Sequence, residues 1–261
     1  MVLQDETIVL VSSLGPSILS LFLTLNAIRF STFERMKKLR WAVVTFPGSN
    51  CDRDMMHLLH HWMGQDAISV WHASEQLPEV DVVVLPGGFS YGDYLRSGAL
   101  ASTSKVMQAI RTFAANGGKV LGICNGFQIL TEAKLLPGAL ARNEHKRFIC
   151  EMASLQAPAS LLPTWASFQN QSFSMPIAHA EGRFVADEAT LQHLAKQGQI
   201  ILQYSSGKNP NGSTMDIAGI CNEQGNVVGL MPHPERAADP LLPSQDGHHW
   251  LARLVDVWFP A

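Results

Sequence analysis

The chain has 261 residues, 19 Lys and Arg, 22 Asp and Glu, and a formal net charge of −3. This composition excludes the basic surface that nucleic acids or anionic membranes require, and the length allows one sizeable core. The four cysteines form no CxxC pair and no zinc-binding spacing, and scattered thiols in such a chain favour a reducing cytoplasm.

The first 35 residues differ from the rest. From Thr7 to Ile28 no residue is charged, and a run of this length would just span a bilayer as a helix. A Gly-Pro pair interrupts the run, and the acidic residues before it have the wrong sign for a signal peptide. We expect residues 1–35 to be an extension outside the fold, from a start codon assigned too early, and residues 36–261 to form one domain. A membrane anchor is the alternative.

From residue 40 onward, strands alternate with helices. Apolar, β-branched runs predict strands at residues 41–46, 67–71, 80–85 and 120–123, and apolar residues at helical spacing predict helices at 53–63, 102–115 and 127–134. This alternation implies right-handed crossovers, and therefore a single-domain α/β fold with a mostly parallel sheet flanked by helices.

The pattern is less regular between residues 149 and 220. Strand-like pieces at 148–155, 200–204 and 217–221 surround one helix at 187–196, and residues 209–213 form a turn. We expect a small antiparallel appendage here. A strand at 227–231 and a closing helix at 247–258 follow.

Cys124 follows the strand at 120–123 and has a glycine two positions away on either side, Gly122 and Gly126. A strand that turns sharply into a helix at such a residue is a nucleophile elbow, and crowding at the turn requires small neighbours. The thiol would then lie above a helix N-terminus, which favours the thiolate. A buried structural cysteine is the alternative.

A Gly-rich loop, Pro86-Gly87-Gly88-Phe89, directly follows the strand at 80–85. Two glycines let the backbone approach a reacting atom and direct N–H groups at it. We expect the amides of Gly88 and Asn125 to form an oxyanion hole, although a plain Gly-rich loop has the same pattern.

His233 and Glu235 lie two residues apart, beside prolines, after the strand at 227–231. Side chains at i and i+2 of an extended segment face the same side, so the carboxylate can orient the imidazole while its other nitrogen faces Cys124. Both motifs follow predicted strands, where open α/β sheets bind ligands. Together they predict a Cys–His–Glu triad, whereas His233 and Glu235 alone would indicate a solvated turn.

The motifs at 122–128 (Gly-Ile-Cys-Asn-Gly-Phe-Gln) and 232–235 (Pro-His-Pro-Glu) resemble the triad motifs of class I glutamine amidotransferases. Further blocks at 47–52, 86–96 and 231–237 are similar to those of one subgroup, the glutaminase subunits of phosphoribosylformylglycinamidine synthases. The resemblance runs from about residue 37 to the C-terminus. A segment at 178–184 departs from it at Ala180, where glycine is expected.

This resemblance implies a flavodoxin-like class I glutamine amidotransferase fold that hydrolyses glutamine to glutamate and ammonia through a cysteine thioester. It makes Cys124 the nucleophile, His233 the base and Glu235 its orienting partner, and it puts Phe89 and Gln128 near bound glutamine. It also implies two partners, a large synthetase subunit and a small bridging subunit. The synthetase subunit would use ATP and Mg to convert formylglycinamide ribonucleotide into formylglycinamidine ribonucleotide. This chain has no GxxxxGK[ST] phosphate loop, and we expect no cofactor in it.

Two other functions remain open. A stand-alone cysteine hydrolase of the same fold would share Cys124 and His233 but would need no synthetase. A non-catalytic binding subunit would not need all three triad residues, which are present here. We expect no metal site, because His57 and His61 have i, i+4 spacing but no Glu or Cys at a suitable offset.

Overall fold

The computed structural model describes residues 37–159 and 161–260, and Lys38–Ala261 forms one compact unit. The expected extension at residues 1–35 lies outside the described residues. Within the described ranges, no helix is both long and apolar enough to cross a membrane.

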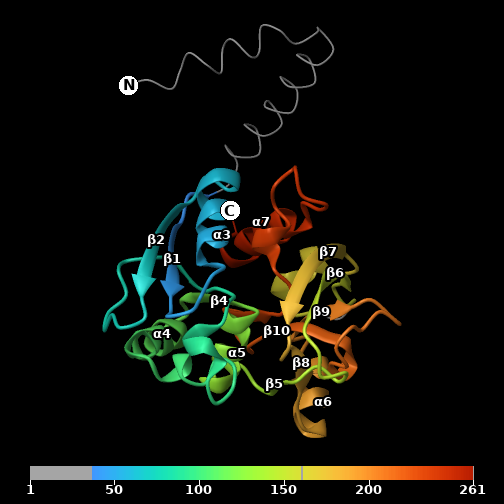
Figure 1. Ribbon diagram of the computed structural model, residues 1–261. Coiled ribbons are helices and arrows are strands. Elements are labelled where there is room, and N and C mark those ends of the chain that lie inside the picture. The colour runs from blue at the N-terminus through green and yellow to red at the C-terminus, as the bar shows by residue number, and fades with distance from the viewer. Residues whose placement is uncertain (1–36, 160, 261) are drawn as a thin grey trace, which may run out of the picture. The chain divides into compact units, whose positions relative to one another are not determined.

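A nine-stranded sheet forms the centre of the fold, with the order β2-β1-β3-β4-β11-β10-β9-β6-β7 (Figure 1). The first five strands in this order are parallel, and each of the last four runs antiparallel to the strand before it. The strands are β1 (Arg40–Thr45), β2 (Asp66–Trp71), β3 (Val82–Leu85), β4 (Lys119–Ile123), β6 (Ile149–Gln156), β7 (Ser172–His179), β9 (Ile200–Tyr204), β10 (Ile217–Cys221) and β11 (Val227–Leu230).

The parallel half is covered by helices on both sides. Strands β3 and β11 are buried along their whole length, which explains their continuous apolar sequences. In Figure 1, α3 and α7 lie on one side of the parallel strands, and α4 and α5 lie on the other. The helices are α3 (Asp52–His57), a π-helical turn η1 (Leu58–Trp62), α4 (Lys105–Ala115), α5 (Asn125–Glu132), α6 (Glu188–Lys196) and α7 (Asp246–Trp258).

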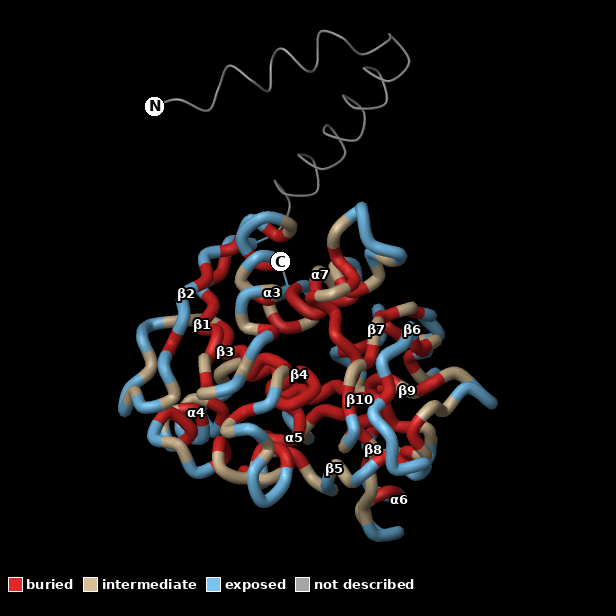
Figure 2. Tube along the Cα trace, in the orientation of Figure 1, coloured by how far each residue is buried: buried red, intermediate tan, exposed pale blue. Residues whose placement is uncertain are grey.

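Helix α5 lies inside the molecule. Its residues from Asn125 to Thr131 are all buried, whereas α4 buries only one stripe, formed by Val106, Met107, Ile110 and Ala114. Figure 2 shows the buried strands and α5 enclosed by more exposed segments. The N-terminus of α5, which carries the residues after Cys124, is therefore held rigidly in the core.

The predicted fold class is confirmed, including a small antiparallel element. That element is a separate two-stranded sheet of β5 (Ala139–Ala141) and β8 (Arg183–Val185). The irregular region also adds antiparallel strands to the main sheet, and β7 among them was not predicted. Its alternating burial fits a strand, but Pro176 interrupts the pattern; proline is tolerated because β7 is the edge strand.

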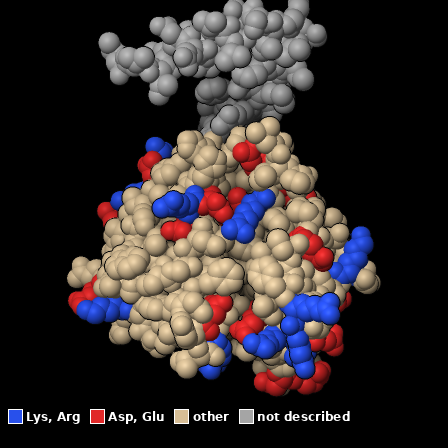
Figure 3. Space-filling view, in the orientation of Figure 1, with Lys and Arg blue, Asp and Glu red and all other residues tan. Residues whose placement is uncertain are grey.

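Charged side chains are mixed on the surface. On the face shown in Figure 3, Lys and Arg lie among Asp and Glu, and no large area of one sign forms there. This distribution agrees with the small net charge, and that face has no continuous basic area of the kind that binds nucleic acid.

Candidate active site

Cys124 stands at the turn between β4 and α5, in a backbone conformation that side chains rarely adopt (φ 49°, ψ −103°). The neighbouring glycines make this turn possible. A Cβ atom on Gly126 would overlap the carbonyl oxygen of Leu85, and one on Gly122 would come within 2.7 Å of the Gly126 carbonyl. The strand–turn–helix geometry expected of an elbow is therefore present, and the strain is concentrated at the thiol-bearing residue.

His233 and Glu235 form a buried pair beside this turn. Strand β11, which precedes them, pairs in parallel with β4, so that Leu230 lies opposite Ile123. His233 Nδ1 lies 2.5 Å from Glu235 Oε1, and His233 Nε2 is buried with no hydrogen-bond partner among the residues that the structure describes. We expected an extended segment here, but Pro234–Arg236 forms a 3₁₀ turn that brings the carboxylate back to the ring.

The charges around His233 favour its protonated form. Burial alone would lower the pKa of His233, but the Glu235 carboxylate and the Cys124 thiol raise it well above its ordinary value. The Cys124 thiol itself lies 3.7 Å from the carbonyl oxygen of Ala178. An imidazolium beside a thiol is the arrangement that stabilises a thiolate nucleophile.

A second thiol lies next to the same pair. Cys51 is buried, and burial raises its pKa. Arg236 Nη2 lies 3.1 Å from Cys51 Sγ, and ligand atoms of Cys51, His233 and Glu235 lie within 4.8 Å of one another. These three side chains could together hold a soft metal ion, but two of them, His233 and Glu235, already form the hydrogen-bonded pair. Sequence reasoning did not place Cys51 here, although the block at 47–52 follows a strand end.

The Gly-rich loop also reaches the site. A Cβ atom on Gly87 would lie 2.7 Å from His233 Cε1, so glycine allows the loop to pack on the imidazole. Gly88 (φ 134°) lies against Ser49, with which it forms a β-bridge, and Phe89 is 45% exposed. Asn125 joins this loop to the elbow, because its Oδ1 accepts a hydrogen bond from the N–H of Ser90 at 3.2 Å.

Gln128 is buried one helical turn beyond Cys124. Its Nε2 donates to the carbonyl oxygen of Glu181 at 2.6 Å, and its Oε1 accepts from Asn125 Nδ2 at 2.8 Å. The side chain predicted to lie near the substrate is therefore fixed between α5 and the segment after β7.

Strand β7 ends at a second histidine, which the motif analysis did not single out. His179 is buried, its Nδ1 lies 3.0 Å from Asn143 Oδ1, and its Nε2 has no hydrogen-bond partner within the described part of the chain. Because Gly182 N–H also donates to Asn143 Oδ1, the histidine Nδ1 carries the proton in this pair. Burial, with the nearby charge of His233, lowers the pKa of His179 to about 4. One histidine at this site is charged at neutral pH and the other is neutral.

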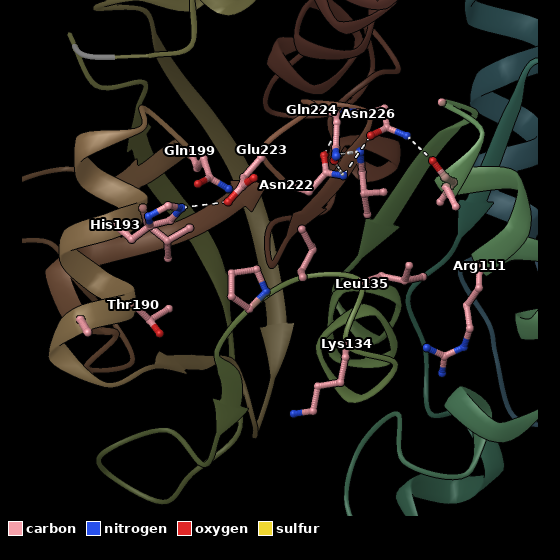
Figure 4. Close-up of a pocket in the computed structure, with 18 residues that line it drawn as sticks. Arg111, Lys134, Leu135, Thr190, His193, Gln199, Asn222, Glu223, Gln224 and Asn226 are labelled. Carbon is pink, nitrogen blue, oxygen red and sulfur yellow. Dashed lines mark hydrogen bonds and ion pairs between the residues drawn. The ribbon is translucent and has the colours of Figure 1, made fainter.

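A cavity of about 730 Å³ lies at the opposite edge of the sheet, where β4 and β11 begin. Figure 4 shows His193 paired with Glu223 on one side of it and Arg111 on the other. None of the predicted site residues lines this cavity, so we do not assign it as the reaction centre despite its volume.

Comparisons with known proteins identify the family of the chain. The model of the CobB/CobQ-like glutamine amidotransferase domain matches residues 38–256. A Nostoc sp. (strain PCC 7120) protein named "Phosphoribosylformylglycinamidine synthase subunit PurQ" is 54% identical over 210 residues, which are 80% of this chain and 93% of that protein. A protein of the same name from Gloeobacter violaceus is 49% identical over 225 residues, 83% of this chain and 97% of its own length.

Solved structures give the same result. A chain in "Structure of PurLQS from Thermotoga maritima" superposes with a TM-score of 0.75 at 40% identity, over 84% of this chain and 99% of that one. Another Thermotoga maritima structure, described as a glutamine amidotransferase, has a TM-score of 0.59 at 17% identity, over 86% of this chain and 100% of its own. The second likeness concerns the fold alone.

Proposed function

The chain belongs to the CobB/CobQ-like glutamine amidotransferase domain family, and we propose that Cys124, His233 and Glu235 carry out its chemistry. It is the glutaminase subunit of phosphoribosylformylglycinamidine synthase and acts in purine biosynthesis. One observation carries the assignment of residues. A thiol on a strained strand–helix turn lies beside a buried histidine that is charged by its carboxylate partner.

In the first half of the reaction, the Cys124 thiolate attacks the side-chain carbonyl carbon of glutamine. The carbonyl π electrons move to oxygen, and the amides of Gly88 and Asn125 stabilise this oxyanion. As the oxyanion collapses, the C–N bond breaks and His233 donates its proton to the departing nitrogen, which leaves as ammonia. The raised pKa of His233 supports this acid role.

In the second half, neutral His233 takes a proton from water, and the resulting hydroxide attacks the γ-glutamyl thioester. Glutamate leaves, and the Cys124 thiolate and the imidazolium are restored. Glu235 holds the proton-bearing Nδ1 and stabilises the positive charge on the ring. Glutamine and water become glutamate and ammonia, with no change of oxidation state.

Ammonia is protonated and lost in water, so the product needs an acceptor close by. This subunit works with a synthetase subunit and a further subunit of phosphoribosylformylglycinamidine synthase, as in the PurLQS assembly. We propose that the synthetase is the large subunit, that it uses ATP and Mg for the amination, and that the small subunit bridges the two. We propose no cofactor for this chain and a cytoplasmic location, which its four free cysteines support.

Covalent capture tests the proposal directly. A diazoketone analogue of glutamine is expected to label Cys124 in the wild-type complex and not in Cys124→Ala, which also loses glutamine-dependent amination. Cys150→Ala, which removes the exposed cysteine, is the matched control and should leave both unchanged. Labelling at another cysteine would overturn the proposal, and so would glutamine-dependent amination by the Cys124→Ala complex. Equal glutaminase rates with and without the synthetase subunit would instead favour a stand-alone hydrolase.

Two substitutions separate the roles within the triad. His233→Ala should lower kcat by roughly 10⁶-fold and Glu235→Gln by roughly 10⁴-fold, since hydrolase triads lose most when the base is removed. Steady-state glutaminase kinetics in the complex measure both. A larger loss in Glu235→Gln than in His233→Ala would contradict the assignment of His233 as the base.

A further inference from the structure

The cavity at the edge of the sheet opposite the triad takes no part in the proposed chemistry, although its volume is about 730 Å³. It lies between the C-terminal ends of α4 and α5, the helix α6 and the turn that joins β10 to β11 (Figure 4). A pocket of this volume can hold a small organic molecule. The polar groups and the charges on its wall indicate the chemistry of a ligand that fits.

One side of the cavity carries a buried hydrogen-bond acceptor. Gln199 is 2% exposed, and its Nε2 donates to the carbonyl oxygen of Cys221 at 2.9 Å, which fixes the orientation of the amide. Its Oε1 is buried and has no hydrogen-bond partner within the described ranges. Because a buried acceptor without a partner costs free energy, this atom favours a ligand that presents an N–H group.

The other side of the cavity is cationic. Figure 4 shows Lys134 and Arg111 there, away from Gln199. Arg111 donates to the carbonyl oxygens of Ala133 and Ser102, which holds its guanidinium in place and leaves further N–H groups for a ligand. The contact with Ala133 also occupies a carbonyl group at the end of α5 that would otherwise repel an anion.

The carboxylate on the wall does not neutralise these two cations. Among the described residues that line the cavity, Glu223 is the only acidic one. Its Oε1 lies 3.1 Å from His193 Nε2, on the side of the cavity that faces away from Arg111 (Figure 4). The cationic side is therefore suited to a phosphate group.

The backbone at Lys134 supports a use for its charge. Lys134 follows the C-cap of α5 with φ 60°, a conformation in which glycine is the favoured residue. A lysine here strains the backbone and places a long cationic side chain on the cavity wall. Strain of this kind persists where the residue serves a site.

Apolar side chains line the cavity as well, namely those of Leu135, Pro137, Ala189 and Leu194. They offer a surface on which a flat ring can pack. A ligand that matches the whole cavity has an N–H donor on a flat heterocycle and a phosphate group at its other end. A 6-aminopurine mononucleotide has these three features.

We propose that this cavity binds a 6-aminopurine mononucleotide, with the amino group donating to Gln199 Oε1 and the phosphate facing Lys134 and Arg111. Charge-assisted hydrogen bonds hold the phosphate, and the apolar wall packs against the base. This site lies where β4 and β11 begin, whereas the triad follows the ends of the same strands. Its occupation therefore does not depend on the glutaminase assignment.

Isothermal titration of the full-length chain with adenosine 5′-monophosphate (AMP) tests the inference. The synthetase subunit is left out, because the ATP site proposed for it would also bind the nucleotide. The wild-type chain should bind AMP with a Kd on the order of 0.1 mM. Two related ligands examine the two ends of the site: purine riboside 5′-monophosphate lacks the amino group, and adenosine lacks the phosphate. Each should bind roughly tenfold more weakly than AMP.

Lys134→Asn and Lys146→Asn are a matched pair of variants. Both lysines have a positive φ (60° and 58°), which Asn tolerates, but Lys146 does not line the cavity. Lys134→Asn should weaken AMP binding roughly tenfold, whereas Lys146→Asn should leave the Kd within about twofold of wild type. No binding of AMP at millimolar concentration would rule out the site. Equal affinities of wild type and Lys134→Asn, or of AMP and purine riboside 5′-monophosphate, would also contradict it.

Discussion

At the residue scale, two buried histidines take opposite charge states because their partners differ. The partner of His233 is a carboxylate, which stabilises the imidazolium, whereas the partner of His179 is the Asn143 amide, which cannot compensate a charge. Because the pKa of His179 is low, its Nε2 stays unprotonated and does not take the proton of the nearby His233 imidazolium.

This difference predicts a pH dependence of stability. His179 has a pKa of about 4 when folded and an ordinary value near 6.5 when unfolded, so the unfolded chain binds the proton first. The stability that this group contributes is complete above pH 6.5 and is lost as the pH falls toward 4, by roughly 2 kcal/mol at pH 5.

Urea unfolding of wild type and His179→Gln at pH 7.5 and pH 5 measures this contribution. The wild type should lose roughly 2 kcal/mol more than the variant between the two pH values. Parallel losses in both proteins would mean that His179 is accessible to protons in the folded state.

The proximity of Cys124, His233 and Glu235 was predictable because each of them lies in a local motif. Gly122 and Gly126 mark the turn at Cys124, and prolines flank His233. Because both motifs follow predicted strands, the sequence suggested that the two side chains lie close together. Cys51 and His179 were not predicted, since their positions depend on which strands become neighbours. The polar partners of Gln128 depend on the same topology.

At the element scale, the strand–helix alternation predicted the parallel half well, because each buried strand is a continuous apolar run. The helix predicted at 53–63 begins at Asp52 as α3 and continues from Leu58 as the π-helical turn η1, a change of register that apolar spacing does not reveal. Of the antiparallel strands that follow residue 149 in the main sheet, only β7 was not predicted. It alternates buried with more exposed residues and contains a proline.

The contact between α5 and β3 predicts a strong effect at one glycine. Gly126→Ala places a methyl group onto the Leu85 carbonyl, and neither buried element can move aside, so the free energy of unfolding should fall by about 3 kcal/mol or more. Gly117→Ala is the control. Its Cβ meets nothing within 4 Å, and only the positive φ (85°) opposes it, at about 1–2 kcal/mol.

Urea unfolding of the two variants gives both free energies, and the rate of Cys124 labelling reports the geometry of the elbow. A loss in Gly126→Ala no larger than in Gly117→Ala would show that β3 and α5 can separate locally. In that case the elbow would not be as rigid as its burial suggests.

At the scale of the whole molecule, the compact unit begins at Lys38, and the family model begins at the same residue. All the residues proposed for chemistry and recognition lie within this unit. Removal of residues 1–35 should therefore leave the free energy of unfolding within about 0.5 kcal/mol and glutamine-dependent amination unchanged.

The truncated and full-length chains should be compared in urea unfolding and in the assembled complex. A loss of amination with unchanged unfolding would instead assign the segment a role in assembly. Mass spectrometry of the native protein complements this test, because peptides from residues 1–35 would contradict the early start codon.

The pairing of β4 with β11 joins two stretches of chain that are synthesised far apart in time. A ribosome-bound chain that ends before Val227 already contains Cys124 but has neither the neighbouring strand nor the imidazole that follows it. With the roles proposed for Cys124 and His233, such a nascent chain releases no ammonia, because its sulfur has no proton donor. Synthesis itself thus delays the onset of glutamine consumption until the segment that begins at Val227 has emerged and β11 has joined the sheet.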